Sequence, residues 1–169
     1  MLKSNRLWLI NCLFKLFPET RLFGLKATIM RWCGARIGRN VRISSSARFL
    51  GNGELVIGDG VWIGADALLI AVSPAKIEIK EHCDLGPQVA ILTGTHRIEC
   101  SNSRAAGVGI ARSVVVGSGC WLCARSLILP GVTIGDRTVV AAGSVVASSF
   151  ELKNVLLAGV PAKVKKSYA

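Results

Sequence analysis

Aromatic residues are scarce in this 169-residue sequence: Phe, Trp and Tyr make up only 6% of it, although hydrophobic residues make up 51%. The apolar part is therefore mostly Val, Ile, Leu and Ala, and it is accompanied by 18 glycines. This mixture favours many short β-strands with tight turns and argues against a helical bundle. At this length the chain fits one domain with a short appendage.

Long hydrophobic runs are also missing, since no apolar stretch reaches the roughly 20 residues that a membrane-spanning helix needs. The apolar segment Leu7–Phe17 is short, contains Lys15 and is not followed by a small-residue cleavage site, so we do not expect a secretory signal. We therefore predict a cytoplasmic protein whose six cysteines are reduced. The segment 6–17 is predicted either as a helix packed against the body or a neighbouring subunit, or as an interfacial helix lying on a membrane.

Acidic residues are nearly absent from the first part of the chain. Residues 1–48 contain ten Lys or Arg and the single acid Glu19, whereas residues 49–169 contain eleven bases and nine acids. Most of the formal net charge of +11 thus belongs to the N-terminal region. It predicts either a solvated basic collar or contact with an anionic partner, namely lipid headgroups or an anionic substrate. Nucleic acid is not expected, because no aromatic-interleaved basic face or nucleic-acid motif is present.

Metal-ligand patterns are incomplete. Cys120 and Cys123 have the spacing of half a metal or redox site, but no second Cys pair or suitably spaced His completes it. We predict that these two cysteines are small packing residues in strands.

What the sequence has in abundance is a six-residue repeat. An aliphatic residue recurs at every sixth position, and a small residue follows it in most cases. Each hexad is expected to form a short strand and a turn, and it buries its apolar side only when successive coils stack into a solenoid. The repeat positions are Ile37, Ile43, Ile57, Ile63, Leu69, Ile79, Leu85, Ile91, Val116, Leu122, Ile128, Ile134, Val140 and Val146.

The repeat and the closing stretch Ala158-Gly-Val-Pro-Ala-Lys163 together resemble the hexapeptide-repeat acyltransferase family. Residues 117–147 look like its sugar O-acetyltransferases of the maltose and galactoside type and the polysaccharide acetyltransferases near them. The resemblance covers about residues 35–166 and implies an all-β fold: a left-handed parallel β-helix over 35–169, with residues 1–34 as a basic, helical N-terminal extension. It further implies acetyl-CoA as co-substrate and a homotrimer with CoA grooves between subunits. Related carbonic anhydrases bind zinc through three histidines, whereas this chain has two, so no metal is expected.

His96 is the candidate catalytic base. It lies in Thr93-Gly-Thr-His96, where the repeat gives way to its longest interruption, residues 95–113. In the family a Thr-His or Gly-His pair at this position deprotonates the acceptor. Histidine suits that role because an imidazole can take a proton at neutral pH while the acceptor attacks the thioester. The second histidine, His82, is predicted to be a turn residue.

The resemblance also assigns residues to CoA, position by position. Ala124 and Ala142 would present backbone to the pantetheine arm, and Trp121 would form part of the groove wall. Lys163 and Lys166 would lie near the 3′-phosphate and pyrophosphate, where cations are favourable.

Several departures from the family pattern concern the acceptor. The sugar acetyltransferases carry an Asn and an acidic residue upstream of the base; here Gly64 replaces the Asn, and Asp66 is the candidate substrate-binding residue. A cation expected after the last hexad is missing, and Lys153 is a candidate substitute. Maltose or galactoside therefore loses support as the acceptor.

We predict an acetyl-CoA-dependent acetyltransferase that modifies a sugar, at a hydroxyl, in cell-surface polysaccharide or O-antigen biosynthesis, by direct attack without an acyl-enzyme. One alternative is N-acetylation of an amino sugar on a nucleotide-linked sugar. An alternative of another class is a non-catalytic solenoid that docks on membranes through residues 1–48.

Overall fold

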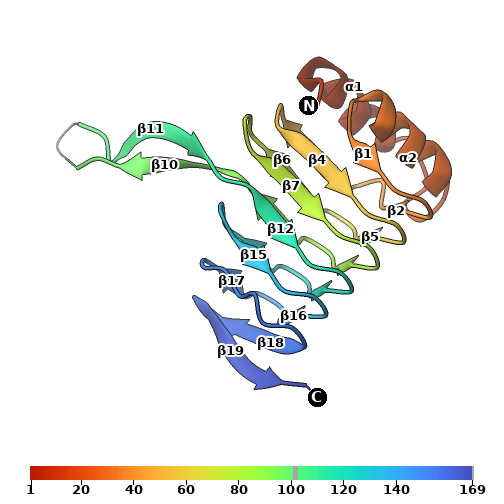
Figure 1. Ribbon diagram of the computed structural model, residues 1–169. Helices are drawn as coiled ribbons and strands as arrows, with labels where there is room; N and C mark the ends of the chain where they lie inside the picture. Colours follow the sequence, from red (N-terminus) through yellow and green to blue (C-terminus); the bar gives the residue numbers. More distant parts are fainter. Residues whose placement is uncertain (101–102, 169) are drawn as a thin grey trace.

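The computed structural model describes residues 1–100 and 103–168; residues 101–102 and 169, which belong to the predicted range 35–169, lie outside the described residues. Within the described residues, two helices, α1 (Ser4–Phe14) and α2 (Phe23–Trp32), precede 19 strands. Figure 1 shows the helices at one end of a stack of strands and the C-terminus at the other.

Seventeen of these strands form three sheets that run along the stack, and the other two, β10 (Gly94–Ile98) and β11 (Ala106–Ala111), pair with each other. Sheet A consists of β1 (Arg36–Ile37), β4 (Glu54–Ile57), β7 (Lys76–Ile79), β12 (Val114–Val116) and β15 (Thr133–Ile134). Sheet B consists of β2 (Arg42–Ile43), β5 (Trp62–Ile63), β8 (Asp84–Leu85), β13 (Trp121–Leu122), β16 (Val139–Val140), β18 (Val155–Gly159) and β19 (Ala162–Ser167). Sheet C consists of β3 (Arg48–Gly51), β6 (Leu68–Ala71), β9 (Ala90–Leu92), β14 (Leu127–Ile128) and β17 (Val145–Val146).

In each coil the chain passes through sheets A, B and C in turn, and five coils are complete. Within these three sheets neighbouring strands are parallel, except that β19 returns antiparallel to β18. We name the three rows of turns by the sheets they join: the AB, BC and CA corners. The predicted parallel β-helix with a helical N-terminal extension is confirmed.

The hexad positions form the core. All fourteen predicted repeat residues are buried, the most exposed being Ile37 at 8%. Side chains alternate along a strand, so the residue two positions before each of them also points inward. Val61, Cys83 and Thr138 are buried examples. Each six-residue unit thus directs one pair of side chains into the core, and three such units make one coil.

The N-terminal end of the solenoid is covered by α1. Its buried face, Leu7, Ile10 and Phe14, packs into the core cluster. The Asn11 amide donates to the Phe49 carbonyl (2.9 Å) and accepts from the Phe49 N–H (3.2 Å). Since β3 is the last strand of sheet C, Asn11 takes the place of a missing neighbour strand and covers an edge that would otherwise be open to pairing.

The second helix covers sheets A and B at the same end. Arg31 donates to the carbonyls of Ile37 (3.0 Å) and Gly38 (2.6 Å). The fully buried Lys26 donates to the Ser45 hydroxyl (2.8 Å) and the Glu19 carbonyl (3.0 Å). Burial lowers the pKa of Lys26. In the described part of the chain, neither helix is long and apolar enough to cross a bilayer.

Candidate active site

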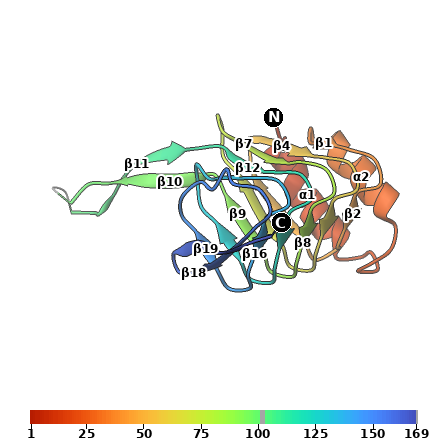
Figure 2. The same ribbon diagram turned by 60° about the horizontal axis from the view of Figure 1, so that its bottom comes forward.

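The candidate base lies on an arm that leaves the solenoid. The longest interruption of the repeat forms an antiparallel hairpin, β10 (Gly94–Ile98) with β11 (Ala106–Ala111), at the CA corner between the third and fourth coils. Figures 1 and 2 show this hairpin projecting away from the body of the molecule. His96 is in β10, opposite Gly109, and is exposed.

A hydrogen bond fixes the tautomer of His96. Its Nδ1 is 2.8 Å from the Gly107 carbonyl oxygen. A carbonyl can only accept, so Nδ1 carries the proton and Nε2 presents a lone pair. In the described residues Nε2 has no hydrogen-bond partner. When the ring is neutral, this bond therefore selects the tautomer that can accept a proton at Nε2.

The local hairpin geometry keeps that ring accessible. The pairing register shifts between His96 and Ile98, which marks a β-bulge of the kind that re-aims side chains near functional sites. A Cβ added at Gly109 would lie 3.8 Å from Cε1 of His96, so a glycine at this position leaves the flank of the ring open.

Two of the predicted CoA residues and the predicted acceptor residue lie along a different edge of the solenoid. At the BC corner, four stacked turns each have a residue with positive φ (55° to 68°), which we name the BC ladder: Asp66, Gln88, Arg125 and Gly143. Backbone hydrogen bonds join successive turns, from Gln88 N to Ala65 O (2.8 Å), from Arg125 N to Pro87 O (2.9 Å) and from Gly143 N to Ala124 O (3.0 Å).

A small residue precedes each member of the BC ladder: Ala65, Pro87, Ala124 and Ala142. Ala124 is half-buried and Ala142 is exposed. These two residues and Asp66, predicted from separate motifs, thus lie along one edge of the solenoid.

The other predicted CoA residues lie farther along sheet B. Trp121 is 55% exposed in β13, in the same coil as Ala124. Lys163 and Lys166 are exposed on β19, the last strand of the sheet. Lys153, the candidate substitute cation, is instead paired with Asp136 (2.8 Å) at the AB corner.

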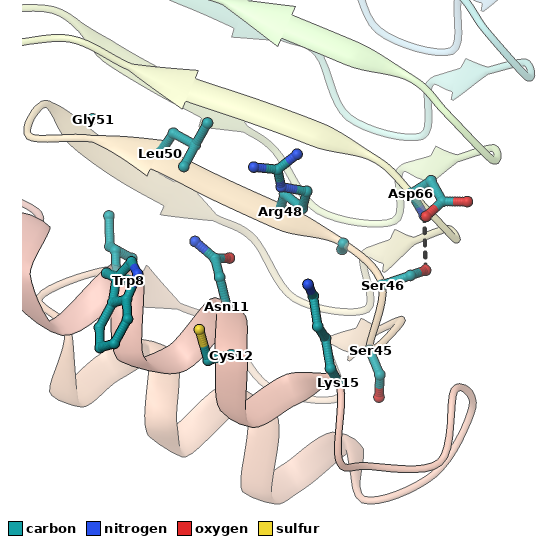
Figure 3. A pocket seen from close by; sticks show the side chains of 12 residues that line it. Trp8, Asn11, Cys12, Lys15, Ser45, Ser46, Arg48, Leu50, Gly51 and Asp66 are labelled. Carbon is teal, nitrogen blue, oxygen red and sulfur yellow. Dashed lines mark hydrogen bonds between the residues drawn. The ribbon is translucent and has the colours of Figure 1, made fainter.

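A groove between α1 and sheet C adjoins Asp66. This helix groove, shown in Figure 3, has a volume of about 600 Å³. Its polar and aromatic lining includes Trp8, Lys15, Arg48 and Asp66. The Asp66 N–H donates to Ser46 Oγ (2.9 Å), which leaves the Asp66 carboxylate available. Among the described residues, neither Lys15 nor Arg48 is in an ion pair.

Sequence reasoning selected Asp66 but missed the other groove residues. Arg48 begins an interruption of the repeat and Lys15 interrupts an apolar segment, so both carried a signal. The signal was incomplete because α1 and β3 are brought together only by the fold. Among the described residues, none of those that line the helix groove comes from the β10–β11 hairpin, so His96 does not line the groove beside Asp66.

Cys120 and Cys123, the two cysteines with half-site spacing, lie at the core and at its edge. Cys120 is buried beside Cys83 in the preceding coil, and Cys123 lies in the next turn. The neighbouring Cys120 thiol, together with burial, raises the pKa of the Cys83 thiol, whereas the Cys83 thiol lowers the pKa of Cys120. Burial raises the pKa of Cys123. No group of three or more His, Cys, Asp or Glu in the described residues has the arrangement of a metal site.

Comparison with known proteins gives consistent matches. The family model described as bacterial transferase hexapeptide (six repeats) matches residues 113–148. WcaF of Escherichia coli K12, whose name assigns it an acetyltransferase role in colanic acid biosynthesis, is 32% identical over 163 residues, covering 96% of this chain and 86% of WcaF.

Two solved structures share the fold over nearly the whole chain. A maltose O-acetyltransferase from Clostridium difficile 630 is 26% identical with a TM-score of 0.69, covering 98% of this chain and 86% of its own. The hexapeptide-repeat acetyltransferase VCA0836 from Vibrio cholerae, complexed with acetyl-CoA, is 20% identical with a TM-score of 0.71, covering 97% and 86%.

Proposed function

Because this chain belongs to the hexapeptide-repeat transferase family, we propose that it is an acetyl-CoA-dependent acetyltransferase that modifies a sugar hydroxyl in cell-surface polysaccharide or O-antigen biosynthesis. The observation that carries the proposal is the fixed tautomer of His96, whose exposed ring offers Nε2 as a proton acceptor. Homology with WcaF supports a polysaccharide pathway.

The proposed reaction is direct transfer. His96 Nε2 takes the proton of the acceptor hydroxyl as the oxygen attacks the thioester carbonyl of acetyl-CoA. The carbon–sulfur bond then breaks, the acetyl group stays on the sugar oxygen, and the leaving CoA sulfur takes the proton from the imidazolium. The burial of Cys83 and Cys120 and the raised pKa of Cys123 argue against a cysteine acyl-enzyme.

The small residues of the BC corner suit the donor. Ala124 and Ala142 carry no side chain beyond Cβ, so the pantetheine arm could lie against their backbone, with Trp121 as part of the wall. The exposed Lys163 and Lys166 would meet the phosphates of the nucleotide end.

We further propose a homotrimer with shared sites. His96 is on a projecting hairpin, whereas Asp66, Ala124 and Ala142 lie on the BC corner of the body. A complete site would then combine the hairpin of one subunit with the BC corner of its neighbour.

The helix groove is proposed to bind an anionic acceptor. Asp66 would accept hydrogen bonds from sugar hydroxyls, and the unpaired Lys15 and Arg48 would bind the phosphates of a nucleotide-linked or lipid-linked sugar. We place the enzyme in the cytoplasm, at the inner face of the membrane, where residues 1–48 would contact lipid.

The test is acetyl-CoA turnover, followed by thiol release, on a panel of matched hydroxy and amino sugar nucleotides. His96→Ala should lower kcat about 10²- to 10⁴-fold, the usual contribution of general base catalysis. The matched control is His82→Asn, which alters the other histidine at a corner where its φ of 58° suits Asn. Equal turnover by wild type and His96→Ala on every accepted sugar would overturn the base assignment. Preference for the amino sugars would replace O-acetylation with N-acetylation.

A further inference from the structure

Large apolar side chains are unusually exposed on the two N-terminal helices and the segments beside them. Of the fourteen exposed large hydrophobic residues in the described chain, seven belong to the first 32 residues. They are Met1, Trp8, Leu9, Leu16, Leu22, Leu25 and Trp32. This density far exceeds that of the solenoid, so the exposure needs an explanation.

The geometry of α1 turns part of this set away from the body. Successive residues of a helix are about 100° apart, so a residue two positions after a buried one lies about 200° around the helix. Leu9 stands in this relation to the buried Leu7, and the exposed Leu16 follows just beyond the C-terminal end of α1. They therefore form an outward apolar stripe along α1 and its C-terminal end.

Helix α2 presents a similar stripe. Leu25 and Trp32 are two positions from the buried Ala27 and Met30, so they lie on the outer side of α2. The two helices are tied together at this side: Arg6 of α1 lies over the Trp32 ring (4.1 Å to the centroid) and donates to the Trp32 carbonyl (2.9 Å). Leu9, Leu16, Leu25 and Trp32, which we name the cap face, thus cover one end of the molecule, where Figure 2 shows the helices side by side.

The charges around the cap face have one sign. Besides the buried Lys26, the helices and their flanking segments contribute cations at positions 3, 6, 15, 21 and 31, and the single acid is Glu19. The Glu19 carboxylate already accepts from the Ser46 hydroxyl (2.6 Å), on the solenoid side. An anionic lipid surface complements both features, because apolar side chains enter the headgroup boundary while Lys and Arg meet phosphates. A second copy of this chain would instead bring like charges together.

We propose that the cap face docks the enzyme onto an anionic lipid bilayer as a peripheral protein. The docking extends the proposed function, since the helix groove opens beside α1 and would face acceptors carried by the same membrane. It does not require acyl transfer, so binding and turnover can be tested separately.

The experiment is flotation of the full chain with vesicles of phosphatidylcholine alone, or of phosphatidylcholine with about one-third phosphatidylglycerol. We expect binding to the phosphatidylglycerol vesicles, weakening as salt is raised. Leu9→Ser/Leu16→Ser should reduce the partition coefficient by about tenfold or more, because two apolar contacts are lost. The matched control is Leu152→Ser/Val160→Ser, which alters equally exposed residues outside the N-terminal region.

Equal binding to both vesicle types, or unchanged binding of Leu9→Ser/Leu16→Ser, would overturn the docking. A smaller assembly formed by this variant, measured by light scattering, would also overturn it and assign the face to a second copy. Turnover of a soluble acceptor should be the same for wild type and this variant, which separates docking from catalysis. Wild-type protein that binds vesicles but turns over no acceptor would count against the proposed function alone.

Discussion

At the scale of single residues, His96 shows how a short local structure prepares a group for chemistry. The hairpin supplies a carbonyl acceptor for Nδ1 from Gly107, and a glycine at 109 beside the ring. Neither feature is in the Thr-His motif itself. The motif identified the residue, and the backbone of the opposite strand selects which ring nitrogen carries the proton when the ring is neutral.

The cations of the helix groove give a testable difference between acceptors. Arg48→Gln should raise KM about fivefold for a phosphate-bearing sugar, because an exposed charge pair contributes up to about 1 kcal/mol. Turnover of a neutral sugar should be unchanged. Arg42→Gln is the control, since Arg42 lies over the Trp62 ring and does not line the helix groove. A rise in KM for both acceptors would show that Arg48 does not recognise charge.

At the scale of elements, the cover over β3 depends on one side chain. Asn11→Ala would leave the Phe49 N–H and carbonyl unpaired at the helix interface, and we expect a loss of about 1–3 kcal/mol in the free energy of unfolding. Asn5→Ala, an exposed change on the same helix, should stay within about 0.5 kcal/mol. Urea unfolding of both variants measures the difference, and equal losses would contradict the edge-cover role.

The AB corner carries carboxylates whose pKa values are lowered. A hydrogen bond from the Arg39 backbone lowers the pKa of Asp59, and one from the Ser118 hydroxyl lowers that of Glu81. The Lys153 ammonium, 2.8 Å away, does the same for Asp136. Each group therefore favours folding while it is charged.

These lowered pKa values predict how the stability of the fold changes with pH. A carboxylate whose folded pKa is depressed stabilises the fold above the ordinary carboxyl value of about 4, and this is lost as pH falls through the lower folded value. We expect the thermal midpoint to drop below pH of about 4, and to drop less steeply in Asp59→Asn and Asp136→Asn. A midpoint that does not change with acid, or equal slopes in all three proteins, would contradict the assignment.

The elements differ in how far the sequence predicted them. Hexad residues such as Ile63 and Val140 were predictable, because every coil imposes the same inward position on an aliphatic residue. The docking of α1 could not be predicted in this way. In the sequence Asn11 is only a polar residue that interrupts an apolar segment, and its partner Phe49 is distant. The spacing in the sequence likewise suggested Cys123 as the partner of Cys120. The parallel pairing of β13 with β8 instead places Cys120 beside Cys83, which is distant in the sequence.

At the scale of the whole molecule, the candidate site is divided between two parts of the surface. The BC corner residues could be predicted individually from motifs, but their alignment on one edge needed the register of the coils. The separation of His96 from that edge also depends on the hairpin, whose direction no hexad pattern specifies.

Subunit mixing tests the proposed sharing. His96→Ala and Ala142→Trp should each be inactive alone, the first without a base and the second with a blocked donor edge. Trimers reassembled from an equal mixture should regain about a quarter of wild-type activity, since each site needs one intact hairpin and one intact neighbouring edge. No recovery on mixing, with trimers verified by mass, would indicate that each chain makes its own site.

The stacking of the BC ladder fixes the distances along this edge of the solenoid. Asp66 and Gly143 are three coil steps apart, and each step is one interstrand spacing of about 4.8 Å, so the ladder measures roughly 14 Å. The distance between two positions on this edge therefore changes only in whole coil steps. A related chain with one coil more or fewer between the Asp66 and Gly143 positions would place them one interstrand spacing farther apart or closer together.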